Sequence, residues 1–221
     1  MNFLITAGPT REYIDPVRFI SNASSGRQGV AIAEEAAKNG HAVVLIMGPC
    51  PAIPAKNINV INITSAEEMF KNILYYRNWA DVLIMTAAVC DWRASSKSGK
   101  KIKKTKKTIA IKLKQNPDIL AAIGKLKREG KTKPDLTMVG FSVDTGNIIE
   151  DAINKLKRKS LDLIIANPVV SINSEFTKSI MIDKSGEVVK LPHMRKNELA
   201  KRLISLIYRK KIGQSFNKNP N

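Results

Sequence analysis

A loop near the N-terminus holds the first residues whose types and spacing could do chemistry. Residues 8–26 form a polar loop. Its last residues are small or carry an amide: Asn22, Ser24, Ser25 and Gly26. A turn of glycine and serine that opens a helix presents backbone N–H groups without helical acceptors, so it can bind an anion. Gly26 and Gly29 match half of a dinucleotide-binding glycine motif, and tight packing of a helix on a strand explains them equally well.

Lysines supply positive charge that a phosphorylated ligand would need. The formal net charge is +18, and two segments carry nearly all of it: residues 97–114 hold nine lysines and no acid, and residues 195–221 hold eight basic residues and one acid. A strongly basic surface is typical of nucleic-acid binding, which stays an alternative function. Aromatic residues form only 5% of the chain and do not interleave with the lysines, which argues against it as the main function.

Two later features of the sequence also suit an anionic ligand. Pro117 stands where helices often begin and Asp118 follows it, so the N–H groups of this turn could meet phosphate oxygens. Lys155 and Lys159 are four residues apart and therefore share one face of a predicted helix. Each feature has a plain structural explanation too, since a pair of lysines on a helix is usually a solvated face.

Short apolar runs alternate with amphipathic stretches along the chain. We expect strands at 2–7, 42–47, 57–63, 81–87, 108–114, 137–142 and 161–166, helices at 28–39, 65–79, 117–128, 147–159 and 196–210, and a hairpin of 178–182 with 188–191. Continuously apolar strands are typical of a parallel sheet covered on both faces. The pattern predicts a three-layer, Rossmann-like, doubly wound α/β fold whose mostly parallel sheet ends in a C-terminal hairpin and helix.

The sequence also indicates the domain organisation and the cellular location. Residues 1–212 are expected to form one nucleotide-binding domain, and residues 213–221 a disordered basic tail. The apolar runs are far shorter than the roughly 20 residues that cross a membrane, and the N-terminus lacks a signal-peptide pattern. Cys50 and Cys90 are too few for a disulfide framework and lack metal-site spacing. We therefore expect a cytoplasmic protein.

Four blocks of sequence resemble phosphopantothenoylcysteine synthetase (phosphopantothenate–cysteine ligase), the C-terminal half of a bifunctional bacterial coenzyme A biosynthesis flavoprotein. They stand in family order: the loop from Gly8 to Gly29, AAVCDWR at 87–93, KIKK at 101–104 and NPDIL at 116–120. The resemblance extends over about residues 3–210. The first loop and the spacing from KIKK to NPDIL are its most specific parts.

The resemblance implies an amide ligation. The carboxylate of 4′-phosphopantothenate attacks the α-phosphate of a nucleoside triphosphate, CTP in most bacterial members, which gives an acyl nucleotidylate and pyrophosphate. The amine of L-cysteine then displaces CMP and forms 4′-phosphopantothenoylcysteine. The sequence leaves CTP against ATP open. Mg²⁺ is expected with the triphosphate, held by phosphate oxygens and water rather than by a protein metal site.

Residue by residue, the resemblance also assigns roles. Lys101 is expected to be required for forming the acyl nucleotidylate, and Asn22 to hold the intermediate through its side-chain amide. The residues expected to bind the nucleotide are Met85, Thr86, Ala87, Asp91, Lys101, Pro117, Asp118, Ile119, Leu120, Phe141, Lys155 and Lys159. The loop expected to bind substrate and phosphate comprises Gly8, Thr10, Arg18, Asn22, Ser24, Ser25, Gly26 and Gly29.

The chain departs from the family pattern in a few places. The flavin-dependent decarboxylase half has no counterpart in this sequence, so ligation alone and no flavin are expected. Trp92 replaces the usual tyrosine, Arg27-Gln28 replaces Lys-Met, and Ser142 stands where alanine is common. Family members are usually dimeric, so we expect a homodimer with small-molecule partners, and neither a membrane nor nucleic acid as its primary partner.

A nicotinamide-dependent reductase on the same fold is a third possible function. Such enzymes carry a full glycine motif directly after the first strand and an acidic residue that binds ribose near the end of the second. Here the second strand ends in Met47-Gly48-Pro49, without that acid. The reductase is therefore the weakest of the three alternatives.

Overall fold

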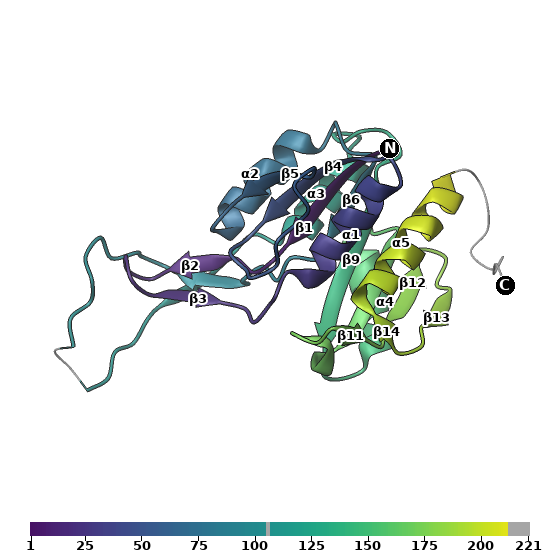
Figure 1. Ribbon diagram of the computed structural model, residues 1–221. Coiled ribbons are helices and arrows are strands. Elements are labelled where there is room, and N and C mark those ends of the chain that lie inside the picture. The colour runs from purple at the N-terminus through teal and green to yellow at the C-terminus, as the bar shows by residue number, and fades with distance from the viewer. Residues whose placement is uncertain (105–106, 212–221) are drawn as a thin grey trace.

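An eight-stranded sheet forms the middle layer of the protein (Figure 1). The computed structural model describes residues 1–104 and 107–211. The strand order is β13-β12-β10-β9-β6-β1-β4-β5, with bounds β1 Asn2–Ala7, β4 Ala42–Met47, β5 Asn59–Asn62, β6 Val82–Met85, β9 Thr137–Asp144, β10 Leu163–Pro168, β12 Ile180–Asp183 and β13 Val188–Lys190. The strands from β10 to β5 are parallel, and β12 and β13 add an antiparallel edge.

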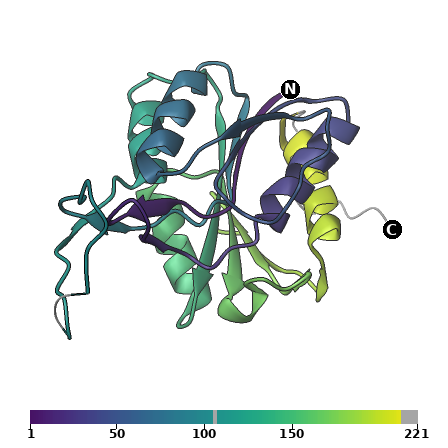
Figure 2. The same ribbon diagram turned by 60° about the vertical axis from the view of Figure 1, so that its left-hand side comes forward.

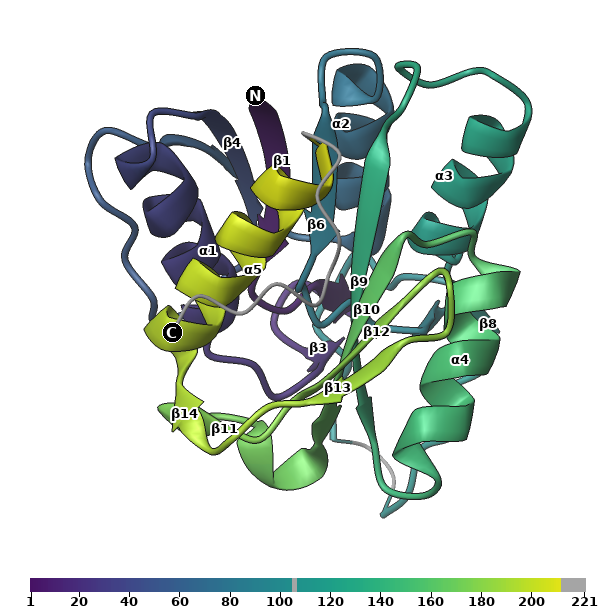
Figure 3. The ribbon, with the colours of Figure 1, turned by 90° about the vertical axis from the view of Figure 1, so that its right-hand side faces the viewer.

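Helices cover both faces of this sheet. In the described residues they are α1 Arg27–Lys38, α2 Ala66–Tyr76, α3 Ile119–Arg128, α4 Ile148–Arg158 and α5 Lys196–Lys211. Figure 3 shows α1 and α5 on one face and α2, α3 and α4 on the other. Alternation along β1 divides the core in the same way, because Phe3 and Ile5 pack with α1 and α5 while Leu4 packs with α2 and α3. The predicted three-layer, doubly wound α/β fold is confirmed.

Local signals in the sequence set where two of the helices begin. Ser65 is the N-cap of α2, and its Oγ accepts a hydrogen bond from Glu68 N at 3.2 Å. The Glu68 carboxylate in turn accepts from Thr64 N at 2.7 Å, one residue before the cap. For α3, Asp118 is the N-cap rather than part of the first turn, and its Oδ1 accepts from Ala121 N at 3.1 Å.

Two segments differ from their predicted secondary structure: the loop 8–26 and the strand predicted at 108–114. The loop 8–26 contains a short hairpin of β2 Arg11–Tyr13 and β3 Phe19–Ser21. The strand predicted at 108–114 is wrong in extent, since only β8 Leu113–Gln115 pairs, with β7 Trp92–Ala94. Residues 108–112 are exposed and belong to no strand in the described structure, although Lys112 O accepts from Ser95 N at 2.9 Å just beyond the β7–β8 pair, so apolar–polar alternation alone does not make them strand.

A projecting arm consists of the β2–β3 hairpin together with residues 95–104 and 107–112. Figures 1 and 2 show the arm projecting from the body of the protein. At the other end of the sequence, the predicted hairpin is confirmed as β12 and β13. A second small pairing joins β11 Phe176–Thr177 to β14 Met194–Arg195, after the short helix η1 Val169–Ser171.

Helix α5 follows β14 directly and packs along α1. The tail predicted at 213–221 lies outside the described residues. Within the described ranges, no helix has both the length and the apolar character needed to cross a membrane.

Candidate active site

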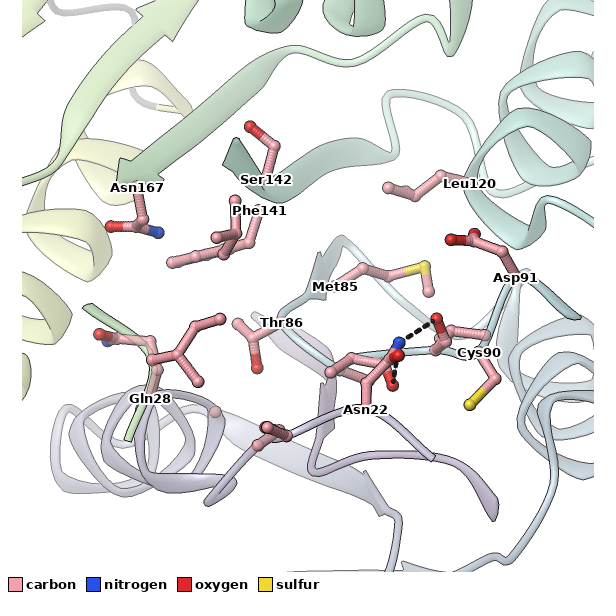
Figure 4. A pocket seen from close by; sticks show the side chains of 18 of the residues that line it. Asn22, Gln28, Met85, Thr86, Cys90, Asp91, Leu120, Phe141, Ser142 and Asn167 are labelled. Carbon is pink, nitrogen blue, oxygen red and sulfur yellow. Dashed lines mark hydrogen bonds between the residues drawn. The ribbon is translucent and has the colours of Figure 1, made fainter. Parts of the chain in front are cut away.

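The carboxyl ends of the parallel strands open into a cleft of about 1090 Å³. Its wall comes from the ends of β6, β9 and β10, from the first turns of α1 and α3, and from one face of α4. Figure 4 shows side chains of β6, β9, β10, α1 and α3 around the cleft. Open α/β sheets bind ligands at this edge, where the crossover connections leave a crevice between neighbouring strands.

Sixteen of the predicted site residues line this one cleft. They are Asn22, Ser24, Ser25, Gly26, Gly29, Met85, Thr86, Ala87, Asp91, Pro117, Asp118, Ile119, Leu120, Phe141, Lys155 and Lys159. These residues come from five separate segments of the chain. The fold therefore brings together the blocks that carry the sequence resemblance.

The N-cap of α1 and its first turn require glycine at one position each. Gly26 is the N-cap of α1 with φ of 74°, and a Cβ there would lie 2.3 Å from Cys50 Sγ. A Cβ on Gly29 would lie 2.5 Å from both Ala7 Cβ and Thr86 Oγ1. Close packing thus explains both glycines, while both also line the cleft. Among the described residues no side chain caps this helix, which leaves N–H groups of its first turn to a ligand.

Asn22 ties the first loop to the segment that follows β6. Its Nδ2 donates to Val89 O at 2.9 Å and, more weakly, to Ala88 O at 3.4 Å (Figure 4). Thr86 makes a similar link, since its Oγ1 donates to Thr6 O at 2.6 Å. The two bonds from Asn22 Nδ2 hold its side chain at the wall of the cleft.

The two predicted lysines of α4 meet carboxylates at the opposite wall. Lys159 Nζ lies 2.9 Å from Asp118 Oδ2, and Lys155 Nζ donates to both carboxylate oxygens of Asp144 at 2.8 Å. Both lysines lie on one face of α4, as their spacing indicates. The pairs neutralise the wall in the absence of ligand, and a phosphate could compete for either ammonium group.

Four predicted residues do not line the cleft in the described structure: Gly8, Thr10, Arg18 and Lys101. Gly8 has φ of 74°, and a Cβ there would lie 2.6 Å from Gly48 O, so it serves the turn. Thr10 is buried, and its Oγ1 accepts from Cys90 N at 2.9 Å. Arg18 and Lys101 both lie on the arm.

Lys101 lies out along the arm, whereas Asn22 lies at the wall of the cleft. Arg18 Nη1 donates to the carbonyl of Ile102, the residue after Lys101, at 3.2 Å. Between Arg18 and Asn22 the chain is the extended strand β3, with a rise of roughly 3.3 Å per residue. The Cα atoms of Arg18 and Asn22 are therefore at most about 13 Å apart, and the backbone beside Lys101 is held at the Arg18 end of this span.

Sequence reasoning missed one cross-link in the wall, made by Asn116. Its Nδ2 donates to Cys90 O at 2.8 Å, and its Oδ1 accepts from Arg93 Nη1. It thereby joins the start of α3 to the segment after β6. Its place in the NPDIL block was the available signal, but nothing local indicates which distant backbone it would meet.

A second missed group lies at the α1 end of the cleft. Lys196 and Arg27 line it together with Asn167, whose Oδ1 accepts from Thr177 Oγ1 at 2.8 Å and from Ser179 Oγ at 2.6 Å. Burial lowers the pKa of Lys196, and the Arg27 guanidinium lowers it further. Two cations close together favour an anion at this end.

The chemistry of the side chains limits what the cleft could do alone. The described residues contain no group of three or more His, Cys, Asp or Glu side chains that could hold a metal. Burial raises the pKa of the Cys90 thiol, so this cysteine is not primed as a nucleophile. What the cleft offers is amide donors, ammonium groups and helix N-termini, a set suited to phosphate oxygens.

Fold and site together define a Rossmann-like α/β protein with a polar cleft for an anionic ligand at the carboxyl edge of its sheet. The sequence model of the DNA/pantothenate metabolism flavoprotein C-terminal domain matches residues 1–210, and the chain belongs to this family.

Two curated relatives are the coenzyme A biosynthesis bifunctional proteins CoaBC of Haemophilus influenzae, 44% identical over 210 residues, and of Escherichia coli, 38% identical over 214 residues. Each match covers 94% of this chain and 51% of the relative, so the chain spans about half the length of these relatives.

Solved structures agree with this family. A crystal structure of the C-terminal domain of CoaBC is 34% identical, with a TM-score of 0.81, and the match covers 96% of this chain and 95% of that one. The DNA/pantothenate metabolism flavoprotein from Streptococcus pneumoniae is 25% identical, also with a TM-score of 0.81, over 95% of this chain and 99% of that one.

Proposed function

We propose that the protein is a phosphopantothenate–cysteine ligase of coenzyme A biosynthesis. A nucleoside triphosphate, CTP by preference, activates the carboxylate of 4′-phosphopantothenate as an acyl nucleotidylate and releases pyrophosphate. L-Cysteine then attacks through its amine, and CMP leaves. The observation that carries this proposal is the convergence of the loop 22–29, the segment 85–91 and the block 116–120 on one cleft.

The charge around the cleft supports a substrate with many phosphate oxygens. We assign the nucleotide to the wall of α3 and α4, where Lys159 meets the N-cap of α3 and Lys155 also lines the cleft. The first turn of α1 and the cations Arg27 and Lys196 suit further phosphate oxygens. Preorganised donors of this kind stabilise charge that develops during the transfer without reorganising.

Mg²⁺ fits this site as a companion of the triphosphate. The carboxylates that line the cleft are Asp91 and Asp118, and the second is already the N-cap of α3. This donor set suits an ion held by phosphate oxygens and water with at most one or two protein oxygens. When bound, Mg²⁺ would neutralise phosphate charge, while Asn22, the helix N-termini and the lysines orient the reactants.

The arm supports a homodimer in which two chains share each site. Lys101 lies on the arm and does not line the cleft of its own chain in the described structure, and the arm exposes apolar side chains, with Val17 56% and Ile109 57% exposed. Pairing of two arms would cover these residues. We therefore propose that Lys101 of one chain serves the cleft of the second chain.

An assay of the complete reaction tests the ligase. Purified protein with Mg²⁺, 4′-phosphopantothenate and L-cysteine is given CTP, ATP, GTP or UTP in turn, and pyrophosphate and nucleoside monophosphate are measured. We expect both products with CTP, and product formation that depends on phosphopantothenate. Lys101→Gln should abolish formation of the nucleotidylate. Failure of the wild type with every nucleotide would reject the function.

A mixing experiment tests the shared site. Lys101→Gln and Asn22→Ala chains should each be inactive alone. If Lys101 acts on the second chain, a mixed dimer has one site with both residues intact, and activity should return to about a quarter of the wild-type level after random exchange. No recovery, in a mixture shown by native mass spectrometry to contain mixed dimers, would place Lys101 in its own chain's site.

A further inference from the structure

One carboxylate in the exposed arm is completely buried. Asp15 stands in the turn of the β2–β3 hairpin, and its side chain has no accessible surface. Its Oδ1 accepts hydrogen bonds from Val17 N at 2.8 Å and Arg18 N at 2.9 Å, which close the turn. These two bonds explain an acidic residue in the turn, but they use only one of its two oxygens.

The second oxygen reaches the lysine-rich segment. Asp15 Oδ2 accepts from Ile102 N at 3.1 Å and from Arg18 Nη1 at 2.5 Å, and Arg18 Nη1 also donates to Ile102 O at 3.2 Å. Both backbone groups of Ile102 are therefore held, 87 residues away from Asp15 in sequence. A further bond joins Ser98 N to Ile14 O at 2.9 Å.

The contact of Asp15 and Arg18 with Ile102 restrains residues 101–104, a segment with few other contacts. Residues 101–104 have no regular secondary structure, and the side chains around Ile102 are exposed lysines. A loop with so few buried apolar contacts samples many conformations unless polar bonds restrain it. The Asp15–Arg18–Ile102 contact lies one residue from Lys101, so it limits where the Lys101 ammonium group can go.

We propose that Asp15 is a positioning residue of the ligation, which acts by fixing the backbone beside Lys101 through Ile102. The proposal rests on the ligase function and on the role of Lys101 in forming the nucleotidylate. A catalytic cation must lie within a few tenths of an ångström of its productive place, and small displacements are costly. Asp15 itself touches no group of the cleft in the described structure.

The variant Asp15→Asn tests this role. The amide keeps one acceptor for the turn but places an N–H₂ group against Ile102 N or Arg18. We expect kcat for pyrophosphate release to fall at least tenfold and the KM for CTP to stay within twofold, since the nucleotide wall is untouched. If this variant misfolds, Asp15→Ser is the second variant, because its hydroxyl can still cap the turn and is too short to reach Ile102.

Two comparisons separate positioning from general destabilisation. Asp183→Asn is the matched control: Asp183 is also a buried carboxylate that closes a hairpin turn, paired with Lys210 Nζ at 2.6 Å, and it lies outside the cleft. It should keep kcat within twofold of wild type. Urea unfolding is the second comparison, since Asp15→Asn should stay folded under the assay conditions while its kcat falls.

The experiment distinguishes rejection of the role of Asp15 from rejection of the ligase function. The wild type is assayed first with all four nucleotides, and its inactivity would reject the proposed function before Asp15 is considered. With an active wild type, the role of Asp15 is overturned if Asp15→Asn keeps kcat within twofold, if its KM for CTP rises as much as its kcat falls, or if Asp183→Asn loses activity equally.

Discussion

Lys159 Nζ lies 2.9 Å from Asp118 Oδ2, and this pair joins the end of α4 to the N-cap of α3 across the wall of the cleft. The Lys159 side chain is mostly buried there, with 18% of its surface exposed. Asp118 has a second task, because its other oxygen caps α3. A triphosphate at this wall would meet an ammonium group that is already in place.

Removing this ammonium group should weaken nucleotide binding. We expect Lys159→Gln to raise the KM for CTP about tenfold with little change in kcat, because a charge-assisted hydrogen bond is worth about 1.5–3 kcal/mol and the contact exists before the transition state. Lys157→Gln is the control, since Lys157 is exposed and lies outside the lining of the cleft. Steady-state kinetics decide the matter, and equal effects of the two variants would contradict the assignment.

Substitution of Gly29 should destabilise the fold. A Cβ at this position meets Ala7 Cβ and Thr86 Oγ1 at 2.5 Å and Thr6 O at 2.8 Å, so Gly29→Ala should lower the free energy of unfolding by about 1–3 kcal/mol. Gly146→Ala is the control, because a Cβ there meets nothing within 4 Å. Urea unfolding measures both. A Gly29→Ala protein as stable as wild type would show that α1 can move away from β1 at no cost.

Substitution of Ser142 should have the opposite effect. Its Oγ is buried and has no hydrogen-bond partner among the described residues. A buried hydroxyl without a partner costs about 1–3 kcal/mol, so Ser142→Ala should raise the free energy of unfolding by about 1 kcal/mol. Thermal and urea unfolding test this. A loss of stability would mean that the hydroxyl is satisfied, for instance by a water molecule.

Acid should weaken the hold of Asp15 on the arm. Burial raises the pKa of Asp15, but bonds from Ile102, Val17 and Arg18 outweigh it and lower the pKa from 3.8 to about 2. A depressed pKa contributes stability above pH 3.8 that is lost as the pH falls toward 2. The difference in stability between wild type and Asp15→Asn should therefore be constant from pH 7 to 5 and shrink below pH 4. A difference that stays constant down to pH 3 would refute this.

The sequence by itself determined the layers and most of the elements. Apolar runs such as β4 and β6 are buried on both faces, and the spacing of Ser65 and Glu68 marked the start of α2, because these signals lie within a few residues of each other. The family motifs, which stand in the expected order along the chain, then indicated sixteen residues of the cleft wall. Each of these inferences rests on local periodicity or on a contiguous motif.

Tertiary structure alone decided which distant groups meet. Nothing local places Ile102 beside Asp15, Asn116 on the carbonyl of Cys90, or Lys196 at the cleft that Asn22 also lines. Alternation in a strand reports only how its own side chains are buried, whereas these contacts depend on crossovers and on the packing of helices across the sheet. For the same reason, only the folded chain separates Lys101 on the arm from the cleft that its motif implied.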